Sequence, residues 1–222
     1  MDSSSADVTR PRAVLFDWDN TLVDTMPVIR DALNTTLTRF GHAPWTMEET
    51  RQRVRKSVRD RFPSLFGDRW RDAADMFYSR YEAIHMEKLA VAEGAAELLD
   101  RVASRQLYLG VVSNKRGDLL RAEVDHLGWS AYFGAIVGAN DAARDKPARD
   151  PVDMALKPVS VPAGPDVWFV GDADIDIECA KNANLTAVLV GNNGHDSEQG
   201  FETHPALHFD DCMALCKFVD SL

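Results

Sequence analysis

The chain has 222 residues, of which 45% are apolar, and its formal net charge is −10. These values indicate one globular domain, or one domain with an insert, and they argue against nucleic acid or an anionic membrane as partner, because both need a basic surface. No run of about 18 apolar residues is present, and the polar, Ser-rich start and three cysteines favour a cytoplasmic location with reduced thiols.

The first predicted element is a strand at 13–16, a continuous apolar run that suits a strand covered on both faces. Asp17 and Asp19 follow, and residues two apart on an extended chain point to the same side, so their carboxylates can share one small volume. Two such acids need a neutralising cation, for which Mg²⁺ is the natural candidate. One carboxylate could then attack an electrophile while its neighbour moves protons. The alternative is a pair of acids that merely caps a turn, since the motif is short.

A helical segment follows, without strand signals between Asp24 and Ala92. Apolar residues recur three and four positions apart, and Thr46 with Glu49 forms a capping box before the second helix. Three helices are expected, over residues 26–40, from 47 to about 61, and from 69 to 85 or beyond. We interpret the segment as a helical insert between the first strand and the rest of the chain.

From residue 93 onward, strand and helix patterns alternate. Strands are expected at 107–112, 135–138, 167–170, 186–190 and 207–209, and helices at 95–103, 119–127, 152–156, 175–183 and 212–219. Strands interleaved with helices build βαβ units, which give a parallel sheet with helices on both faces. The sequence therefore predicts an α/β fold, and such sheets place their chemistry at the carboxyl ends of the strands.

Chemically capable side chains follow four of the predicted strands. Asp17 ends the first strand, and the second is followed by Ser113 and Asn114, whose hydroxyl and backbone N–H suit phosphate oxygens. Lys146 follows the third strand, and Asp172 follows the fourth. Each residue alone is common as a cap or a surface residue. Their joint placement at one sheet edge is hard to explain by structure alone.

These motifs resemble those of the haloacid dehalogenase superfamily of Asp-nucleophile phosphohydrolases, in particular its phosphoglycolate phosphatase-like branch. The resemblance runs from residue 13 to the C-terminus and rests on three segments: Leu15–Thr25 (LFDWDNTLVDT), Val112–Lys115 (VSNK) and Val170–Asp176 (VGDADID). It implies a Rossmann-like parallel core that carries a helical cap. The expected division is a flexible tail at 1–11, a core at 12–24 and 93–222, and a cap at 25–92 that sets substrate specificity.

The third motif of that family is weaker in this chain. Relatives carry Lys-Pro-x-Pro, whereas here the second proline arrives late after Lys146, and Lys157 begins a competing Lys-Pro pair. We favour Lys146, because it precedes a helix and its spacing to Asp172 is close to that of the family. Lys157 follows the helix and is interpreted as a solvated helix end.

The resemblance also assigns roles. Asp17 is the expected nucleophile, which forms an aspartyl-phosphate, and Asp19 is the expected acid and base, which protonates the leaving oxygen and then activates water. Thr21 is expected to hold Asp17 by a hydrogen bond, although a turn role explains it equally well. Ser113, Asn114 and Lys146 would stabilise the transferring phosphoryl group. The expected Mg²⁺ site consists of the carboxylates of Asp17 and Asp172 and the backbone carbonyl of Asp19, with Asp176 beside these ligands or on Lys146.

Basic residues gather in the second helix of the expected cap. Arg51, Arg55 and Arg59 would share one helix face at i,i+4 spacing, where they repel one another unless an anion lies nearby. We hypothesise that Lys56, Ser57 or Arg59 faces the site and reads a second anionic group of the substrate. The more ordinary alternative is a solvated basic face that is matched to the acidic remainder of the protein.

The sequence thus predicts a Mg²⁺-dependent phosphomonoester hydrolase that acts on a small phosphorylated metabolite, as a monomer or a homodimer. Phosphoglycolate is a family-level expectation for the substrate. Two alternatives stay open: a sugar phosphomutase similar to β-phosphoglucomutase, and a binding protein that keeps the fold without turnover. Dehalogenation is disfavoured, because displacement of a halogen from carbon needs neither a metal nor a second aspartate.

Overall fold

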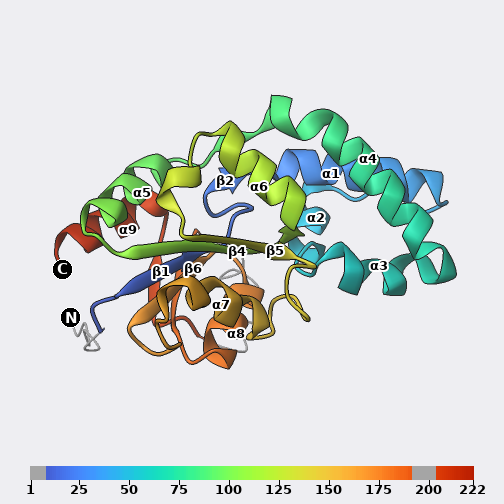
Figure 1. The fold of residues 1–222 in the computed structure, drawn as a ribbon. Coiled ribbons are helices and arrows are strands. Elements are labelled where there is room, and N and C mark those ends of the chain that lie inside the picture. The colour runs from blue at the N-terminus through green and yellow to red at the C-terminus, as the bar shows by residue number, and fades with distance from the viewer. Residues whose placement is uncertain (1–8, 192–203) are drawn as a thin grey trace.

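The computed structural model describes residues 9–191 and 204–222, which form a layered α/β unit with a group of helices at one side (Figure 1). A six-stranded sheet has the order β5-β4-β1-β6-β7-β8, and each strand pair in it is parallel. Its strands are β1 (Ala13–Phe16), β4 (Tyr108–Arg116), β5 (Ala135–Ala139), β6 (Val167–Gly171), β7 (Thr186–Val190) and β8 (Leu207–Phe209). The predicted parallel α/β fold is confirmed. Of the predicted tail at 1–11, the first eight residues lie outside the described residues.

Side chains of the strands alternate between two apolar layers, because successive residues of a strand point to opposite faces. Val14 and Phe16 of β1 join one layer, and Ala13 and Leu15 join the other. The first layer is covered by α5 (Ala95–Ser104), α6 (Gly117–His126) and α9 (Cys212–Asp220), and the second by α7 (Asp150–Leu156) and α8 (Asp174–Asn182), as Figure 1 shows. Both faces of the sheet are buried, which explains the uninterrupted apolar runs of its strands.

The other four α-helices of the described residues pack together as a helical unit (residues 26–88): α1 (Met26–Arg39), α2 (Met47–Arg53), α3 (Val58–Phe66) and α4 (Trp70–Lys88). This unit has its own apolar core, in which Leu33, Phe62 and Tyr81 are buried and which Leu119 of α6 joins from the α/β unit. Three short 3₁₀ turns complete the described helices: η1 (Gly67–Arg69), η2 (Ser130–Tyr132) and η3 (Lys157–Val159).

Two short strands flank the helical unit where the chain leaves and re-enters the α/β unit. They are β2 (Val23–Asp24) and β3 (Ala90–Val91), which pair antiparallel. The expectation of no strand before Ala92 is therefore wrong for β3. A strand of two residues is too short to produce a readable alternation, and its pairing depends on β2, a partner distant in sequence.

The second predicted helix begins as expected but ends early. The backbone N–H of Glu49 donates to Oγ1 of Thr46 at 3.1 Å, and the N–H of Thr46 donates to Oε2 of Glu49 at 2.9 Å, so the capping box is confirmed. Helix α2 ends at Arg53, not near Arg61, because Val54 adopts an extended backbone with φ −89° and ψ 93°. The chain then crosses to the start of α3 in a non-helical segment, residues 54–57.

Side-chain contacts hold this non-helical segment in place. Nε of Arg55 donates to the carbonyl of Gln52 at 3.0 Å, which satisfies a carbonyl group at the end of α2. The guanidinium of Arg55 also pairs with Asp174 at the start of α8. The predicted helix face shared by Arg51, Arg55 and Arg59 does not exist, because the helix that would carry it is interrupted.

Cys179, Cys212 and Cys216 are buried free thiols, as predicted. Among the described residues, none of the helices combines the length and the apolar character needed to cross a bilayer.

Candidate active site

Strand β1 lies between β4 and β6, so the carboxyl ends of these three strands meet at one edge of the sheet. A cleft at this edge is lined on one side by residues that follow the strands, including Asp17, Ser113, Lys146 and Asp172. Its other side is formed by residues of α1 and α4, by Arg51 of α2 and by residues 54–56 and 58. The cleft therefore lies between the α/β unit and the helical unit.

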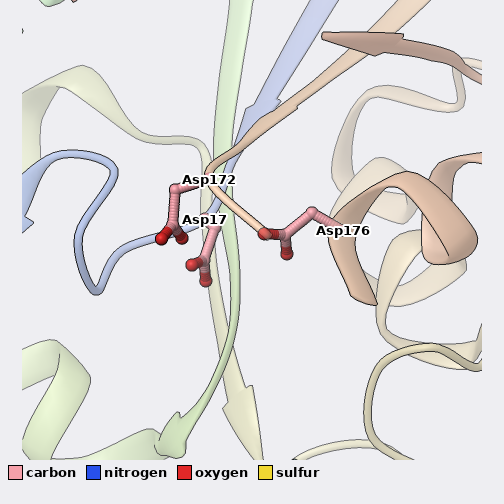
Figure 2. A group of neighbouring side chains, drawn as sticks. All are labelled: Asp17, Asp172 and Asp176. Carbon is pink, nitrogen blue, oxygen red and sulfur yellow. The ribbon is translucent and has the colours of Figure 1, made fainter. Parts of the chain in front are cut away.

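Three carboxylates converge in the cleft. Figure 2 shows Asp17 after β1, Asp172 after β6 and Asp176 from the first turn of α8, with their carboxylates turned toward one another. All three are buried, and one oxygen of each lies within 4.8 Å of the others. Gly171 permits this approach, because a Cβ atom there would lie 2.4 Å from the side chain of Asp176. Any larger residue at Gly171 would displace that carboxylate.

Lys146 is buried between two of these carboxylates. Its Nζ lies 2.6 Å from Oδ1 of Asp17 and 2.7 Å from Oδ1 of Asp176. Its backbone is fixed by Asn114, which accepts from the N–H of Lys146 at 2.9 Å and donates to its carbonyl at 3.1 Å. Lys157, the competing lysine, is exposed in η3. The structure therefore places Lys146, and not Lys157, in the cleft.

Burial and charge compete in this cluster. Burial raises the pKa of Asp17 to about 7, because the opposing charge of Lys146 is itself countered by the charges of Asp176 and Asp19. Burial also lowers the pKa of Lys146, but the charges of Asp17 and Asp176 outweigh this effect and hold the pKa above its ordinary value. Lys146 is therefore a permanent cation in the cleft.

The donor set fits a divalent cation. Three buried carboxylates converge beside one ammonium group, and buried negative charges need nearby positive charge. Carboxylate oxygens are the ligands that Mg²⁺ and Ca²⁺ prefer. Oδ2 of Asp176 already accepts the N–H of Ala173 at 3.1 Å and its Oδ1 contacts Lys146, so Asp17 and Asp172 are the better placed ligands. Asp176 supports the cluster through Lys146, one of the two placements expected for it.

Asp19 lines the same cleft, but its carboxylate is held by other groups. Nζ of Lys115 lies 2.6 Å from Oδ1 of Asp19, and the hydroxyl of Thr25 donates to the same oxygen. The carboxylate of Asp19 is not part of the cluster formed by Asp17, Asp172 and Asp176. A metal contact through its backbone carbonyl stays a prediction.

The residues expected at the phosphate differ in their contacts. The hydroxyl of Thr21 lies 3.5 Å from Oδ1 of Asp172, the second predicted metal ligand. Thr21 thus contacts Asp172 in place of the hydrogen bond that was expected to Asp17. Ser113 is buried at the cleft, and its Oγ accepts the N–H of Lys115 at 3.3 Å. The side chain of Asn114 contacts the backbone of Lys146, as described above. The side chain of Asn114 therefore positions the lysine, and a contact of its backbone N–H with phosphate stays a prediction.

The three cap residues predicted to face the substrate have different surroundings in the structure. Arg59 binds the buried carboxylate of Asp145 with Nη2–Oδ1 at 2.6 Å and Nε–Oδ2 at 3.1 Å, so its guanidinium is occupied. Ser57 is buried outside the cleft lining. Lys56 lines the cleft together with Arg51, and neither has an acidic partner in the part of the chain that is described. The structure thus keeps Lys56 as a candidate and adds Arg51.

Three contacting residues were not predicted. Lys115 and Thr25 contact the carboxylate of Asp19 directly. Glu123 is linked to it through Lys115, whose Nζ lies 2.6 Å from Oε2 of Glu123. Lys115 lies within the second matched motif, which was the available signal. Glu123 had none, because a Glu on an amphipathic helix usually faces solvent. Burial of Glu123 can be recognised only once α4 and α6 are packed.

Comparisons with known proteins identify the family of the chain. The family described as haloacid dehalogenase-like hydrolase matches residues 14–190. The chain is 30% identical over 217 residues to the phosphoglycolate phosphatase of Rhodospirillum rubrum, a match that covers 92% of this chain and 89% of that protein. It is 28% identical over 215 residues to the phosphoglycolate phosphatase of Pseudomonas fluorescens, which covers 92% of this chain and 78% of that protein. The crystal structure of CbbY from Rhodobacter sphaeroides in complex with phosphate has a TM-score of 0.79 at 23% identity and covers 92% of this chain and 96% of that one.

Proposed function

Because the chain belongs to the haloacid dehalogenase-like hydrolase family, we propose that its cleft hydrolyses the phosphate ester of a small metabolite through an intermediate on Asp17. The chain is a phosphatase, a hydrolase of phosphoric monoesters. The observation that carries the mechanism is the contact of Lys146 with Asp17 inside a buried cluster of carboxylates. This contact gives Asp17 a fixed direction and a cation that favours its ionised, nucleophilic form.

The proposed metal is Mg²⁺. Asp17 and Asp172 would hold it through their carboxylates and Asp19 through its backbone carbonyl, with Asp176 behind them on Lys146. When bound, the ion neutralises the carboxylates and the charge that develops on the phosphoryl group.

The proposed first step transfers the phosphoryl group to the protein. One carboxylate oxygen of Asp17 forms a bond to phosphorus while the bond from phosphorus to the ester oxygen breaks. Asp19, which Lys115 and Thr25 hold at the cleft, gives its proton to the departing oxygen, so the product leaves as an alcohol. Ser113, the backbone N–H of Asn114 and the ammonium of Lys146 bind the phosphoryl oxygens, where charge is spread in the transition state.

The proposed second step restores the enzyme. Asp19, now a carboxylate, takes a proton from water, and the resulting hydroxide attacks phosphorus. The bond from phosphorus to the oxygen of Asp17 breaks, and inorganic phosphate leaves. Asp17 returns to a carboxylate and Asp19 to its acid form, so that protons balance over the cycle.

The helical unit is proposed to select the substrate. It corresponds to the cap expected at 25–92, and it covers the cleft with apolar residues of α1 and α4 and with the cations Arg51 and Lys56. Two cations without acidic partners in the described chain support a substrate that carries a second anionic group. Relatives at 28–30% identity are named phosphoglycolate phosphatases. We therefore propose phosphoglycolate, whose second anion is a carboxylate, as the first substrate to test.

The proposal also includes a cytoplasmic location and a monomeric or homodimeric state. Buried free thiols and an acidic chain support the location.

One assay tests the function against its two alternatives. Wild type and Asp17→Asn are incubated with Mg²⁺ and a panel of phosphate esters that includes an aryl phosphate, phosphoglycolate and hexose 1-phosphates. A phosphatase releases inorganic phosphate, and the variant loses this activity. A mutase returns the phosphoryl group to another position of the same sugar. A pure wild-type protein that turns over none of the esters contradicts the enzyme and supports a binding protein.

A further inference from the structure

Glu123 is a buried carboxylate that receives four hydrogen-bond contacts. Its Oε2 lies 2.7 Å from Nε1 of Trp18 and 2.6 Å from Nζ of Lys115. Its Oε1 lies 2.9 Å from the hydroxyl of Tyr81 and 2.7 Å from Nδ1 of His85. The side chain has no exposed surface. Each oxygen of Glu123 thus contacts two donors, which is the full capacity of a carboxylate.

The charge state of this group follows from its partners. Burial by itself would raise the pKa of Glu123, but the charge of Lys115 and the hydrogen bonds outweigh burial and lower the pKa. Glu123 is therefore ionised and accepts from every neighbour. Nδ1 of His85 must then carry the hydrogen in this contact.

Lys115 connects Glu123 to the catalytic cleft. Its Nζ lies 2.6 Å from Oε2 of Glu123 and also 2.6 Å from Oδ1 of Asp19. The ammonium is buried, so its position is set by these two carboxylates and not by solvent. Without Glu123, Lys115 would lose one of the two anions that orient it, and Asp19 would lose a fixed partner.

The donors to Oε1 come from the helical unit. Tyr81 and His85 lie on α4, one turn apart, whereas Glu123 is on α6 of the α/β unit. Both side chains are buried, with exposed fractions of 2% and 4%. A continuous line of contacts therefore runs from α4 through Glu123 and Lys115 to the carboxylate of Asp19.

We propose that Glu123 is a positioning residue, which holds Lys115 against Asp19 and makes the position of Asp19 depend on the docking of α4. The inference rests on the proposed role of Asp19 as the acid of the first step. The competing explanation is that Glu123 only stabilises the packing of α4 on α6, as buried ion pairs do elsewhere.

The two explanations differ in how the loss of activity in a Glu123 variant depends on the leaving group of the substrate. An aryl oxygen leaves without a proton, whereas an alkyl oxygen needs one, so displacement of Asp19 weakens the reaction of alkyl phosphates selectively. General damage to the fold weakens both reactions equally. The readout is kcat/KM for an alkyl phosphate divided by kcat/KM for an aryl phosphate, measured for wild type, Glu123→Gln and Asp19→Asn with Mg²⁺. Thermal unfolding of each variant verifies that the protein is folded.

For Glu123→Gln we expect the alkyl-to-aryl ratio to fall by at least about 10-fold, a part of the full 10²–10⁴-fold contribution of an acid. Arg80→Gln is the matched control, because Arg80 lies on α4 beside Tyr81 but pairs with Asp31 inside the helical unit. Its ratio should equal that of wild type. An unchanged ratio in folded Glu123→Gln, with a lowered ratio in Asp19→Asn, overturns the inference alone. An unchanged ratio in Asp19→Asn overturns the proposed role of Asp19.

A second pair of variants decides the question if Glu123→Gln does not fold. His85→Leu removes the donor to Oε1, whereas His85→Asn keeps an N–H near the position of Nδ1. We expect a lowered alkyl-to-aryl ratio in His85→Leu and a ratio closer to wild type in His85→Asn. Equal ratios in wild type and both variants overturn the inference.

Discussion

The ammonium group of Lys146 lies 2.6 Å from Oδ1 of Asp17, although the two residues are 129 positions apart in the chain. The contact is possible because Asp17 follows the central strand β1, whereas the loop that carries Lys146 is held by Asn114 of the neighbouring strand β4. The fold thus brings a nucleophile of one segment and a cation of another into one buried pair.

Replacement of Lys146 by Met should reduce kcat by about 10²–10³-fold, the usual effect of removing one group that stabilises a transition state. The variant leaves Asp17 and Asp176 without their shared cation. Steady-state kinetics with saturating Mg²⁺ measure the loss. Lys157→Met is the matched control, because Lys157 is exposed in η3. A loss in the control together with normal activity in Lys146→Met would show that the wrong lysine was assigned.

The contribution of Asp17 to the stability of the metal-free protein should fall as the pH rises from about 4 to 7. In the folded chain the pKa of Asp17 is raised from 3.8 to about 7, so the folded state keeps a proton that the unfolded state has lost in this window. Asp17→Asn cannot lose a proton, and we expect it to be more stable than wild type at pH 8 by up to about 4 kcal/mol, at about 1.4 kcal/mol for each pKa unit.

Urea unfolding of both proteins in chelator, at pH 5 and pH 8, measures this difference. The gap between Asp17→Asn and wild type should be larger at pH 8 than at pH 5. Glu178→Gln serves as the control, because Glu178 is an exposed carboxylate close by on α8. A gap that is the same at both pH values contradicts a raised pKa for Asp17.

Removal of divalent cations should abolish phosphatase activity, and Mg²⁺ should restore it. In Asp172→Asn the concentration of Mg²⁺ needed for half-maximal activity should rise by roughly 10-fold or more, since a charged ligand is lost. Mg²⁺ should also raise the unfolding temperature of wild type more than that of Asp172→Asn. Glu178→Gln, a change at an exposed carboxylate of α8, should behave like wild type in both measurements. A full response to Mg²⁺ in Asp172→Asn would remove Asp172 from the ligand set.

Replacement of Lys56 or Arg51 by Ala should raise KM for phosphoglycolate by about 10-fold, since a hydrogen bond to a charged group contributes about 1.5–3 kcal/mol. The same variants should hydrolyse an aryl phosphate with an uncharged aryl group at unchanged KM, because that substrate has no anion besides its phosphate. Arg53→Ala is the control, as its guanidinium stacks on Trp45 away from the cleft. Unchanged KM for phosphoglycolate in both variants would contradict a cap that reads a second anion.

Much of the fold can be predicted from the sequence, because its strands are buried on both faces. Continuous apolar runs such as 13–16 and 167–170 indicate buried parallel strands, and the strand-to-helix alternation gives the sheet edge where Asp17 and Asp172 meet. Tertiary contacts explain the errors. Residues 47–61 have the composition of one helix, and only the contacts of Arg55 with Asp174 and of Arg59 with Asp145 show why the chain is interrupted between them.

The side-chain contacts of the site join residues that are distant in sequence, and this limits what the sequence reveals about the site. Thr21 could be placed near Asp17, but the pattern does not show that its hydroxyl contacts Asp172. Lys115 is visible in the second motif, whereas its sharing between Asp19 and Glu123 requires α6 to be packed under α4. Strand ends predict which residues meet, and the direction of each side chain depends on neighbours that are distant in sequence.

Asp17 is proposed to carry the phosphoryl group during turnover, and chemical trapping identifies the residue that carries it. Wild type is mixed with excess substrate and Mg²⁺, quenched in acid and reduced with borohydride, which converts an aspartyl-phosphate to homoserine, and its peptides are sequenced by mass spectrometry. We expect homoserine at position 17, and none there in Asp17→Asn. Homoserine at another aspartate, or turnover without any modified residue at position 17, would contradict it.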